Sequence, residues 1–272
     1  MSAQVTVLYF AKSAELTGLK EEPVAVPTPI SSGDLWALLL RKQPRLVALQ
    51  GHVILAVRQR YVAIGEQQVT LEDGDEVAVV GAAAERRLEE ETVRRPEACG
   101  PRLTRDVSSD MSEEPRDVFR LSPDWLSVQE VVDAVSSSSC GAVSMFIGTT
   151  REDQVDGRKV VGLEYEAYEA MVQSEFSQLC GDLRARWPSL LHICIHHRLG
   201  WVKVGEASVV VAISSPHRHD GQQAVQLCVS RLKASVPIWK KEVYDTQEVS
   251  WKENAECRWS QSSGSASETK KC

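Results

Sequence analysis

Cationic side chains lie at both ends of one predicted helix in the C-terminal part of the chain. His217 and Arg218 come just before the helix, and Lys233, Lys240 and Lys241 lie near or beyond its other end. A helix N-terminus offers free backbone N–H groups to an anion, and guanidinium groups bind phosphate oxygens. Each residue alone is more typical of a solvated turn, or of a helix C-terminus that favours positive charge. Together, in a chain of formal net charge −7, they predict an anion pocket for a phosphate-bearing ligand.

The length of this helix predicts that the pocket needs two copies of the chain. Asp220 is the expected N-cap, with Gln223 three residues further on. From Asp220 to Lys233 such a helix is roughly 20 Å long, so His217 and Lys233 of one chain are not expected to reach the same small ligand. We predict a symmetric dimer in which His217 and Arg218 of one copy approach Lys233 of the other.

The neighbouring elements follow from hydrophobic spacing. Ser127, with Glu130 three residues on, is the expected cap of a helix whose apolar face repeats every three to four residues. Apolar runs rich in β-branched residues predict strands, and a longer periodic segment that ends at Pro188 predicts a second helix. The predicted elements are strands at 142–147, 160–165, 192–198 and 207–213, a helix at 168–187, a turn at 200–205 and an extended segment at 248–251.

The first part of the chain has its own pattern. Alternating residues 4–10 predict a strand, and the segment up to Gly18 predicts a short helix. The pattern continues with a strand at 24–26, a helix that begins at Ser32 or Gly33 and ends before Pro44, a hairpin over 53–64, and a turn at Asp73-Gly74-Asp75 before a strand at 76–80. This order of strands around a helix predicts a β-grasp, ubiquitin-like domain.

Composition limits the class of protein. With 272 residues, 43% of them hydrophobic, the chain is long enough for one large or two small domains. A pI near 5.5 argues against nucleic acid as a partner, and the absence of a run of 18 apolar residues argues against a membrane span. The N-terminus lacks the pattern of a secretory signal. Seven scattered cysteines without a CxxC pair indicate neither a metal site nor disulfides, so we expect a cytosolic protein without a cofactor.

Several motifs then resemble one known family. Phe146-Ile147-Gly148-Thr149-Thr150-Arg151, His197-Arg198-Leu199-Gly200 and the cationic segment together resemble the large, catalytic subunit of molybdopterin synthase. The resemblance covers residues 117–260 and implies a sulfurtransferase. It also implies an α+β chain in which the β-grasp domain is joined by a disordered linker to an α/β-hammerhead-type catalytic domain.

The resemblance assigns roles to individual residues. It implies that His217, Arg218 and Arg151 bind the phosphate and pterin of precursor Z, a cyclic pyranopterin phosphate. It places Lys233 where the sulfur donor arrives, as the best catalytic candidate, and makes Lys240 a second catalytic or binding cation. Lys241 and Glu242 continue the motif at the edge of the pocket. The implied partners are thiocarboxylated small-subunit carriers, with the homodimer of the catalytic domain inside a heterotetramer.

The N-terminal half resembles the small subunit of the same synthase, a ubiquitin-like sulfur carrier. The matching stretches are residues 7–12, 56–59 and 73–78. In that family the last strand leads to a terminal Gly-Gly whose carboxylate becomes a thiocarboxylate. Here Gly81 is followed by Ala82 and the chain continues, so this domain is not expected to carry sulfur.

Residues 82–116 are rich in Arg, Glu, Ser and Pro and predict a disordered linker, and residues 261–272 predict a disordered tail. The expected domains are therefore 1–81 and 117–260. Met111 lies just ahead of the second domain and could start a separate large subunit, so the joined chain is either a natural fusion or the product of two joined reading frames. Two function classes follow: a sulfurtransferase served by separate carriers, or a self-inhibited or non-catalytic fusion whose N-terminal domain occupies the carrier docking surface.

Overall fold

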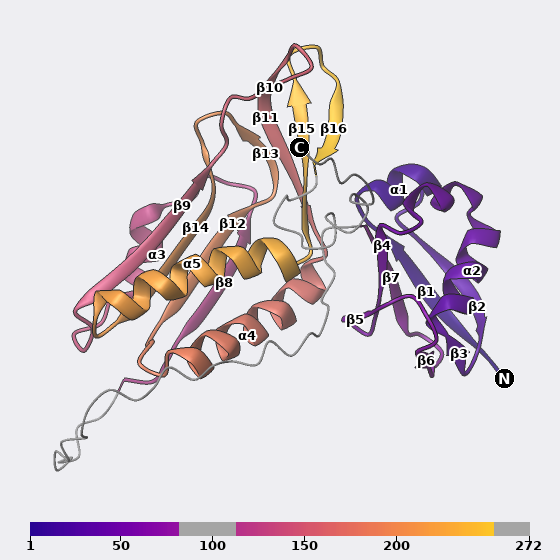
Figure 1. Cartoon of the computed structure of the whole chain (residues 1–272), viewed down its shortest axis with the longest axis horizontal. Coiled ribbons are helices and arrows are strands. Elements are labelled where there is room, and N and C mark those ends of the chain that lie inside the picture. The colour runs from indigo at the N-terminus through magenta and orange to yellow at the C-terminus, as the bar shows by residue number, and fades with distance from the viewer. Residues whose placement is uncertain (82–112, 253–272) are drawn as a thin grey trace, which may run out of the picture.

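A computed structural model describes residues 1–81 and 113–252 of the chain (Figure 1). The predicted tail and all but the last few residues of the predicted linker fall outside these ranges. The domain boundaries at 81, 117 and 260 therefore stay predictions.

The N-terminal domain is a five-stranded sheet with one long helix against it. The central strand β1 pairs with β7 in parallel and with β2 antiparallel, and the sheet order is β2-β1-β7-β4-β5. A parallel pair between the first and last strands is the arrangement that the β-grasp prediction requires. The elements are β1 (Ser2–Tyr9), α1 (Lys12–Thr17), β2 (Glu21–Pro27), β3 (Ile30–Ser31), α2 (Ser32–Lys42), the 3-10 helix η1 (Pro44–Leu49), β4 (Val53–Val57), β5 (Arg60–Val62), β6 (Gln68–Val69) and β7 (Glu76–Gly81).

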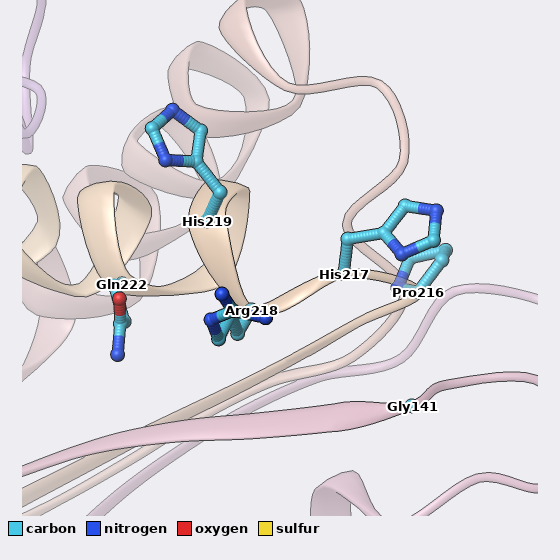
Figure 2. Close-up of a pocket in the computed structure, with 6 residues that line it drawn as sticks. All are labelled: Gly141, Pro216, His217, Arg218, His219 and Gln222. Atoms are coloured by element: carbon cyan, nitrogen blue, oxygen red, sulfur yellow. The ribbon is translucent and has the colours of Figure 1, made fainter.

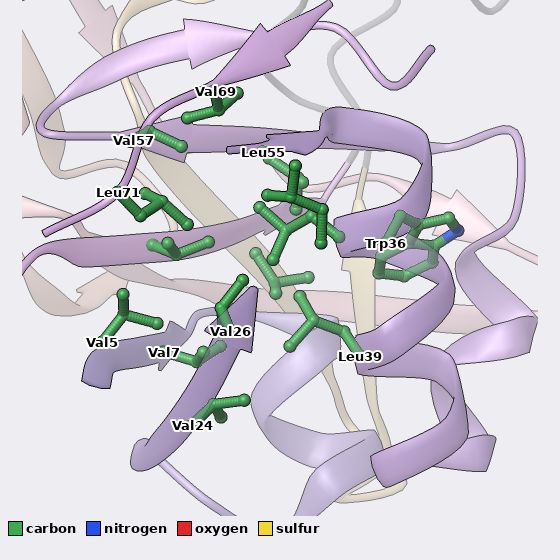
Figure 3. Close-up of a cluster of buried hydrophobic side chains, with 14 of the residues drawn as sticks. Val5, Val7, Val24, Val26, Trp36, Leu39, Leu55, Val57, Val69 and Leu71 are labelled. Atoms are coloured by element: carbon green, nitrogen blue, oxygen red, sulfur yellow. The ribbon is translucent and has the colours of Figure 1, made fainter. Parts of the chain in front are cut away.

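Alternation in the strands and spacing in α2 build the core of this domain. Alternate residues of β1 are buried, so Val5 and Val7 face α2. In Figure 3, Leu39 and Trp36 from α2 lie over the valines of the sheet. The Ser31 side chain accepts a hydrogen bond from the backbone N–H of Asp34 and fixes where the helix begins.

The second domain contains two sheets. Its four-stranded sheet has the order β8-β12-β14-β9, and a second sheet runs β10-β11-β15-β16 with β13 also paired to β11. The elements are β8 (Asp117–Ser122), α3 (Val128–Val135), β9 (Ala142–Thr149), β10 (Gln154–Val155), β11 (Arg158–Ala167), α4 (Glu169–Arg186), β12 (Ile193–Arg198), β13 (Gly200–Lys203), β14 (Ala207–Ser215), α5 (Arg218–Ser235), β15 (Ile238–Tyr244) and β16 (Val249–Lys252). The α+β class is confirmed.

Helices cover both faces of the four-stranded sheet. Residues of α4 and α5 pack on one face, where Ile193, Ile195 and Val211 are fully buried, and Figure 1 shows the two helices side by side there. Helix α3 covers part of the other face through Val131 and Val135. The predicted cap of α3 is present, because the Ser127 hydroxyl accepts from the N–H of Glu130 at 3.2 Å.

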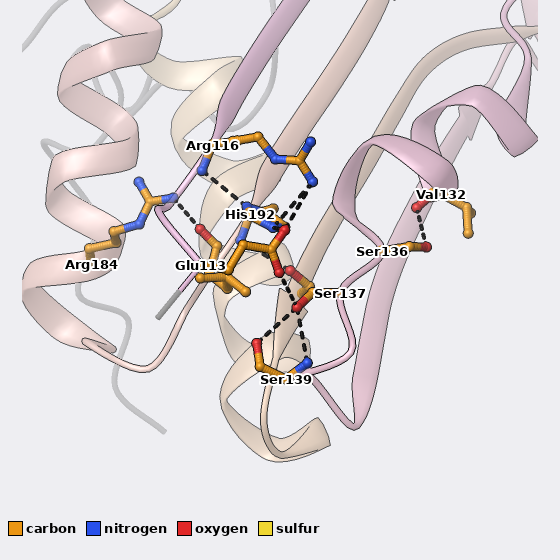
Figure 4. A network of polar contacts seen from close by, with 10 residues as sticks. Glu113, Arg116, Val132, Ser136, Ser137, Ser139, Arg184 and His192 are labelled. Atoms are coloured by element: carbon orange, nitrogen blue, oxygen red, sulfur yellow. Dashed lines mark hydrogen bonds and ion pairs between the residues drawn. The ribbon is translucent and has the colours of Figure 1, made fainter. Parts of the chain in front are cut away.

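The start of the second domain is held by a polar network (Figure 4). The fully buried His192 accepts from the backbone N–H of Arg116 at its Nδ1, so its Nε2 donates to Glu113 at 2.9 Å. The Ser137 hydroxyl donates to the same carboxylate at 2.6 Å, and these hydrogen bonds hold the pKa of Glu113 below its usual range. The network ties the chain ahead of β8 to the neighbouring strand β12.

Two local predictions were wrong, and one strand was missed. Residues 117–122 form β8, which had not been predicted, because it pairs in parallel with the buried strand β12. The segment predicted as a turn at 200–205 begins with β13, which pairs with β11. Helix α5 begins at Arg218 rather than after Asp220, with His217 as its N-cap residue, and the Asp220 carboxylate instead accepts from the Ser189 hydroxyl at 3.0 Å.

Candidate functional site

The first pocket lies at the N-terminus of α5. It has a volume of about 390 Å³ and is lined by Gly141, Pro216, His217, Arg218, His219 and Gln222. Figure 2 shows Arg218 and Gln222 on the same side of the first turn of α5, with His219 on the opposite side. The free N–H groups of the helix and the Arg218 guanidinium make this cavity, which we call pocket 1, suitable for an anion.

Two glycines allow close packing around the N-terminal end of α5. A Cβ at Gly221 would lie 2.6 Å from the Ser215 hydroxyl oxygen and 2.7 Å from that of Ser144. A Cβ at Gly141 would lie 2.8 Å from the carbonyl oxygen of Pro216. A Cβ at Gly141 would force the backbone at Pro216 to shift, and one at Gly221 would displace the two serine hydroxyls between α5 and the sheet.

Gly221→Ala is expected to destabilise the protein by about 1–3 kcal/mol, because the new methyl group overpacks the contact between α5 and the sheet. Gly181→Ala in α4 is the matched control, since a Cβ there meets nothing within 4 Å. Alanine is the better helix former by about 1 kcal/mol, so the control is expected to stabilise. Thermal unfolding of both variants measures the difference, and a Gly221→Ala variant as stable as the control would contradict the close approach.

The second pocket lies near the opposite end of α5 and has a volume of about 530 Å³. The end of β9, the middle of β11, the C-terminal turns of α5 and strand β15 line it. Among its lining residues are Arg151, Lys233, Lys240 and Glu242. This cavity, pocket 2, thus gathers four cationic side chains, because Lys252 of β16 also lines it, over a floor that includes the apolar residues Val209 and Leu232.

Alternation along β15 separates neighbouring residues of the predicted site. Lys240 and Glu242 line pocket 2, whereas Lys241 is in neither pocket. The Lys241 ammonium lies 3.1 Å from a Glu166 carboxylate oxygen and 4.5 Å from the centroid of the Trp251 ring. Its charge is therefore engaged on the face of β15 away from the pocket.

The other charged residues of pocket 2 differ in exposure. The Arg151 side chain is 83% exposed and lies 2.9 Å from Asp153, so it stands at the mouth and can turn toward a ligand. Glu242 is buried, accepts a hydrogen bond from the Tyr244 hydroxyl at 2.8 Å and lies 3.5 Å from the Lys252 ammonium. Glu242 thus balances part of the positive charge of the pocket.

Two further residues complete pocket 2. Tyr165 and His197 line it, with their rings edge to face at 4.9 Å between centroids. Nδ1 of His197 donates to the Arg198 carbonyl oxygen at 2.7 Å, which leaves Nε2 as an acceptor. In the sequence this histidine belongs to the motif His197-Arg198-Leu199-Gly200, but no role in the site was assigned to it. Its place near the end of a predicted buried strand, shortly before Gly200, was the available signal that it could face the same cavity as β11.

Acid is expected to destabilise the second domain through His197. Burial lowers the pKa of His197 to about 4, the hydrogen bond to Arg198 opposes this, and the charge of Lys240 lowers it further. The unfolded chain has a histidine pKa of about 6.5, so between these values the unfolded state binds more protons. This stability is complete above about pH 6.5 and falls toward pH 4 by up to about 1.4 kcal/mol per pH unit. Denaturant unfolding at several pH values should show that the free energy of unfolding falls less with acid in His197→Gln than in the unmodified chain. An equal fall in both chains would contradict the attribution of this acid sensitivity to His197.

The structure therefore distributes the predicted residues over two cavities. His217 and Arg218 lie in pocket 1, and Arg151, Lys233, Lys240 and Glu242 lie in pocket 2. Helix α5, with 18 residues, spans the distance between them and is about 27 Å long. One chain does not bring the two groups of cations together.

Comparisons with known proteins match both halves of the chain. The MoaE protein family matches residues 121–235, and the ThiS family matches residues 7–84. The molybdopterin synthase catalytic subunit of Taeniopygia guttata is 55% identical over 148 residues, which are 54% of this chain and 94% of that protein. Molybdopterin synthase catalytic subunit 1 of Aedes aegypti is 57% identical over 146 residues, which are 53% of this chain and 94% of that protein. The crystal structure of molybdopterin synthase from Staphylococcus aureus covers 50% of this chain and 97% of its own, with 32% identity and a TM-score of 0.47.

These matches define the class as a ubiquitin-like domain of the ThiS family followed by a MoaE-type sulfurtransferase domain. The chain belongs to the family of molybdopterin synthase catalytic subunits, enzymes that transfer sulfur in molybdenum cofactor biosynthesis. The predicted family and enzyme class are confirmed.

Residues 1–81 and 113–252 contain neither a membrane-spanning helix nor a cluster of metal ligands. None of the helices in these ranges has the length and apolar character needed to cross a membrane. No three His, Cys, Asp or Glu side chains in the same ranges are placed to hold one metal ion.

Proposed function

We propose that this chain transfers two sulfurs from thiocarboxylated small-subunit carriers to precursor Z, the cyclic pyranopterin phosphate, and so makes the dithiolene of molybdopterin in the cytosol. The observation that supports this most directly is pocket 2, where Arg151, Lys233 and Lys240 line one cavity. A cavity of about 530 Å³ lies within the usual size range for a small-molecule site.

Each cation has a role that its chemistry suits. The Arg151 guanidinium at the mouth offers paired N–H donors to phosphate oxygens. The ammonium groups of Lys233 and Lys240 lie deeper, between α5 and β15, where they can stabilise negative charge or move a proton as sulfur is transferred. Glu242 and the Nε2 of His197 supply acceptors for the polar edge of a pterin.

The site is proposed to be completed by a second copy of the chain. Strand β9 is an edge of the four-stranded sheet, and its residues Val143, Met145 and Ile147 are each 40% or 41% exposed. Three large apolar side chains in a row on an edge strand favour contact with another protein surface. The exposed row is centred on Met145.

The position of β9 relates this apolar row to the two pockets. Gly141, just before β9, lines pocket 1, and Gly148 and Thr149 at its end line pocket 2. A two-fold axis near Met145 reverses the strand direction in the second copy, so it places pocket 1 of each copy beside pocket 2 of the other. His217 and Arg218 then join Arg151 and Lys233 around one ligand. Two carriers docked on such a dimer give the heterotetramer.

The direct test is turnover with separate components. The full-length chain is incubated with precursor Z and a thiocarboxylated carrier that ends in Gly-Gly, and the dithiolene product is detected after oxidation by fluorescence and mass spectrometry. The proposal predicts product that requires both reagents. Absence of product with an authentic carrier, under conditions where a relative's catalytic subunit turns over, would refute it.

A further inference from the structure

A layer of aromatic and aliphatic side chains joins the two domains of the chain. The Phe10 ring stacks on Tyr168 at 4.7 Å between centroids and on Trp239 at 5.4 Å. We call this layer the interdomain cluster. Its buried members are Ala11, Ile54, Ala56, Ala78 and Val80 of the N-terminal domain and Tyr168, Met171 and Trp239 of the second domain, with Leu8, Phe10, Tyr61 and Trp251 partly buried against them.

Hydrogen bonds cross the same boundary. The Tyr61 hydroxyl donates to the Ser235 carbonyl oxygen at 3.0 Å, at the C-terminal end of α5. The Tyr168 hydroxyl donates to the Glu76 carboxylate at 2.9 Å, and burial together with this acceptor raises the pKa of Tyr168. Met171 is fully buried, so the two domains exclude water from the middle of the contact. This is a specific docking surface rather than a loose apposition.

The interdomain cluster adjoins pocket 2. Trp239, which belongs to the cluster, stands in β15 between Ile238 and Lys240, and both of these residues line pocket 2. Val80, near the end of the last strand of the N-terminal domain, is buried in the same cluster. Figure 1 shows this domain beside the lower part of β15. The docked domain therefore brings the end of its last strand close to the wall of the pocket.

We infer that the N-terminal domain occupies, in its own chain, the surface that a separate ubiquitin-like carrier must use to deliver sulfur to pocket 2. This inference rests on the proposed function. The domain belongs to the same fold family as such carriers and docks by its last strand, but its chain continues from Gly81 into Ala82 and offers no terminal carboxylate. A surface that holds one domain excludes a second, so the chain controls its own access to the sulfur donor.

Two features set the strength of this control. Domains that share one chain meet at an effective concentration on the order of mM, which a dilute carrier cannot match by mass action. Against this, the indole Nε1–H of Trp239 is buried without a hydrogen-bond partner among the described residues, which costs free energy in the docked state. Docking is therefore expected to be reversible, and the carrier binds those molecules in which the N-terminal domain is undocked.

The test weakens docking from the N-terminal side alone, which leaves the surface of the second domain intact for a carrier. Phe10→Asp places a charge in the stack with Tyr168 and Trp239. Val47→Asp is the control, because Val47 is 57% exposed and lies outside the interdomain cluster. The probe is a fluorescently labelled, separately expressed ThiS-family carrier that ends in Gly-Gly, titrated with each full-length chain and followed by anisotropy.

The expected result is that Phe10→Asp binds the carrier at least about tenfold more tightly than the unmodified chain, because the competent fraction rises. Tyr61→Ala, which removes a smaller part of the contact, should change the affinity in the same direction by less, and Val47→Asp should bind like the unmodified chain. Equal affinities for all four chains would overturn the inference, as would an equal gain for Val47→Asp. Circular dichroism establishes whether Phe10→Asp keeps the N-terminal domain folded, and if it does not, Tyr61→Ala decides.

Binding is measured without precursor Z and without a thiocarboxylate, so the result does not depend on turnover. Tighter carrier binding by Phe10→Asp without dithiolene product from any chain would leave the inference standing and refute the proposed function. If Phe10→Asp and the unmodified chain bind the carrier equally and form product at equal rates, the inference is refuted and the proposed function stands.

Discussion

Mixing two inactive variants is expected to restore activity. Arg218→Ala removes a cation from pocket 1, and Lys233→Ala removes one from pocket 2. If each active site combines pocket 1 of one copy with pocket 2 of the other, a mixed dimer has one site that carries both changes and one that carries neither. Random exchange of equal amounts makes half of the dimers mixed, so about one quarter of the unmodified activity should return.

The measurement is dithiolene formation after the two variants have been mixed and allowed to exchange subunits. Each variant alone is the baseline, and a chain carrying both changes, mixed with the unmodified chain, gives the complementary control. Met145→Asp, which places a charge in the exposed apolar row of β9, should lower both the dimer fraction and the recovery. A mixture no more active than its components, in which mixed dimers are shown to form, would mean that each chain carries a complete site.

Much of the fold was predictable because its signals are local. The cap at Ser127 needs only Glu130 three residues on, and the β-grasp order follows from alternation and turn residues within one short domain. The elements that sequence reasoning missed depend on distant partners. Strand β8 forms by pairing with β12, and the Asp220 carboxylate, which was expected to cap α5, accepts a hydrogen bond from Ser189 instead. Neither partner is visible from the local pattern.

In the candidate site, too, some features follow from local sequence signals and others depend on distant partners. No strand was predicted for residues 238–244, so the motif placed Lys240, Lys241 and Glu242 together at one pocket. As strand β15, it obeys a period of two, which puts Lys240 and Glu242 in pocket 2 and Lys241 opposite Glu166. The separation of the two ends of α5 could be predicted, because helix length follows from residue count alone. The contact of Tyr165 with His197 could not, because it depends on how β11 and β12 come together.

Loss of Lys233 or Lys240, two of the three lysines that line pocket 2, is expected to abolish most of the activity. Lys233→Ala and Lys240→Ala each remove an ammonium group from the cavity, and a proton-transferring or charge-stabilising group typically contributes at least about 100-fold to a rate. Lys241→Ala provides a matched control from the adjacent position of the same strand, because it removes the same side chain from the face that carries Glu166. Its rate should remain within a few fold of the unmodified chain.

Separate values of kcat and KM distinguish a catalytic role from a binding role among the cations of pocket 2. A group that acts only in the transition state lowers kcat and kcat/KM together, whereas one that binds the phosphate mainly raises KM. We expect the first pattern for Lys233, and for Arg151 at the mouth of pocket 2 the second. If Lys241→Ala were as damaging as Lys233→Ala, with all variants folded, Lys241 would have to contact the substrate. The alternation of β15 that places Lys240 in pocket 2 and Lys241 on the opposite face would then not hold during catalysis. The basis for placing the reaction in pocket 2 would then be lost, because that placement depends on which face of this strand meets the substrate.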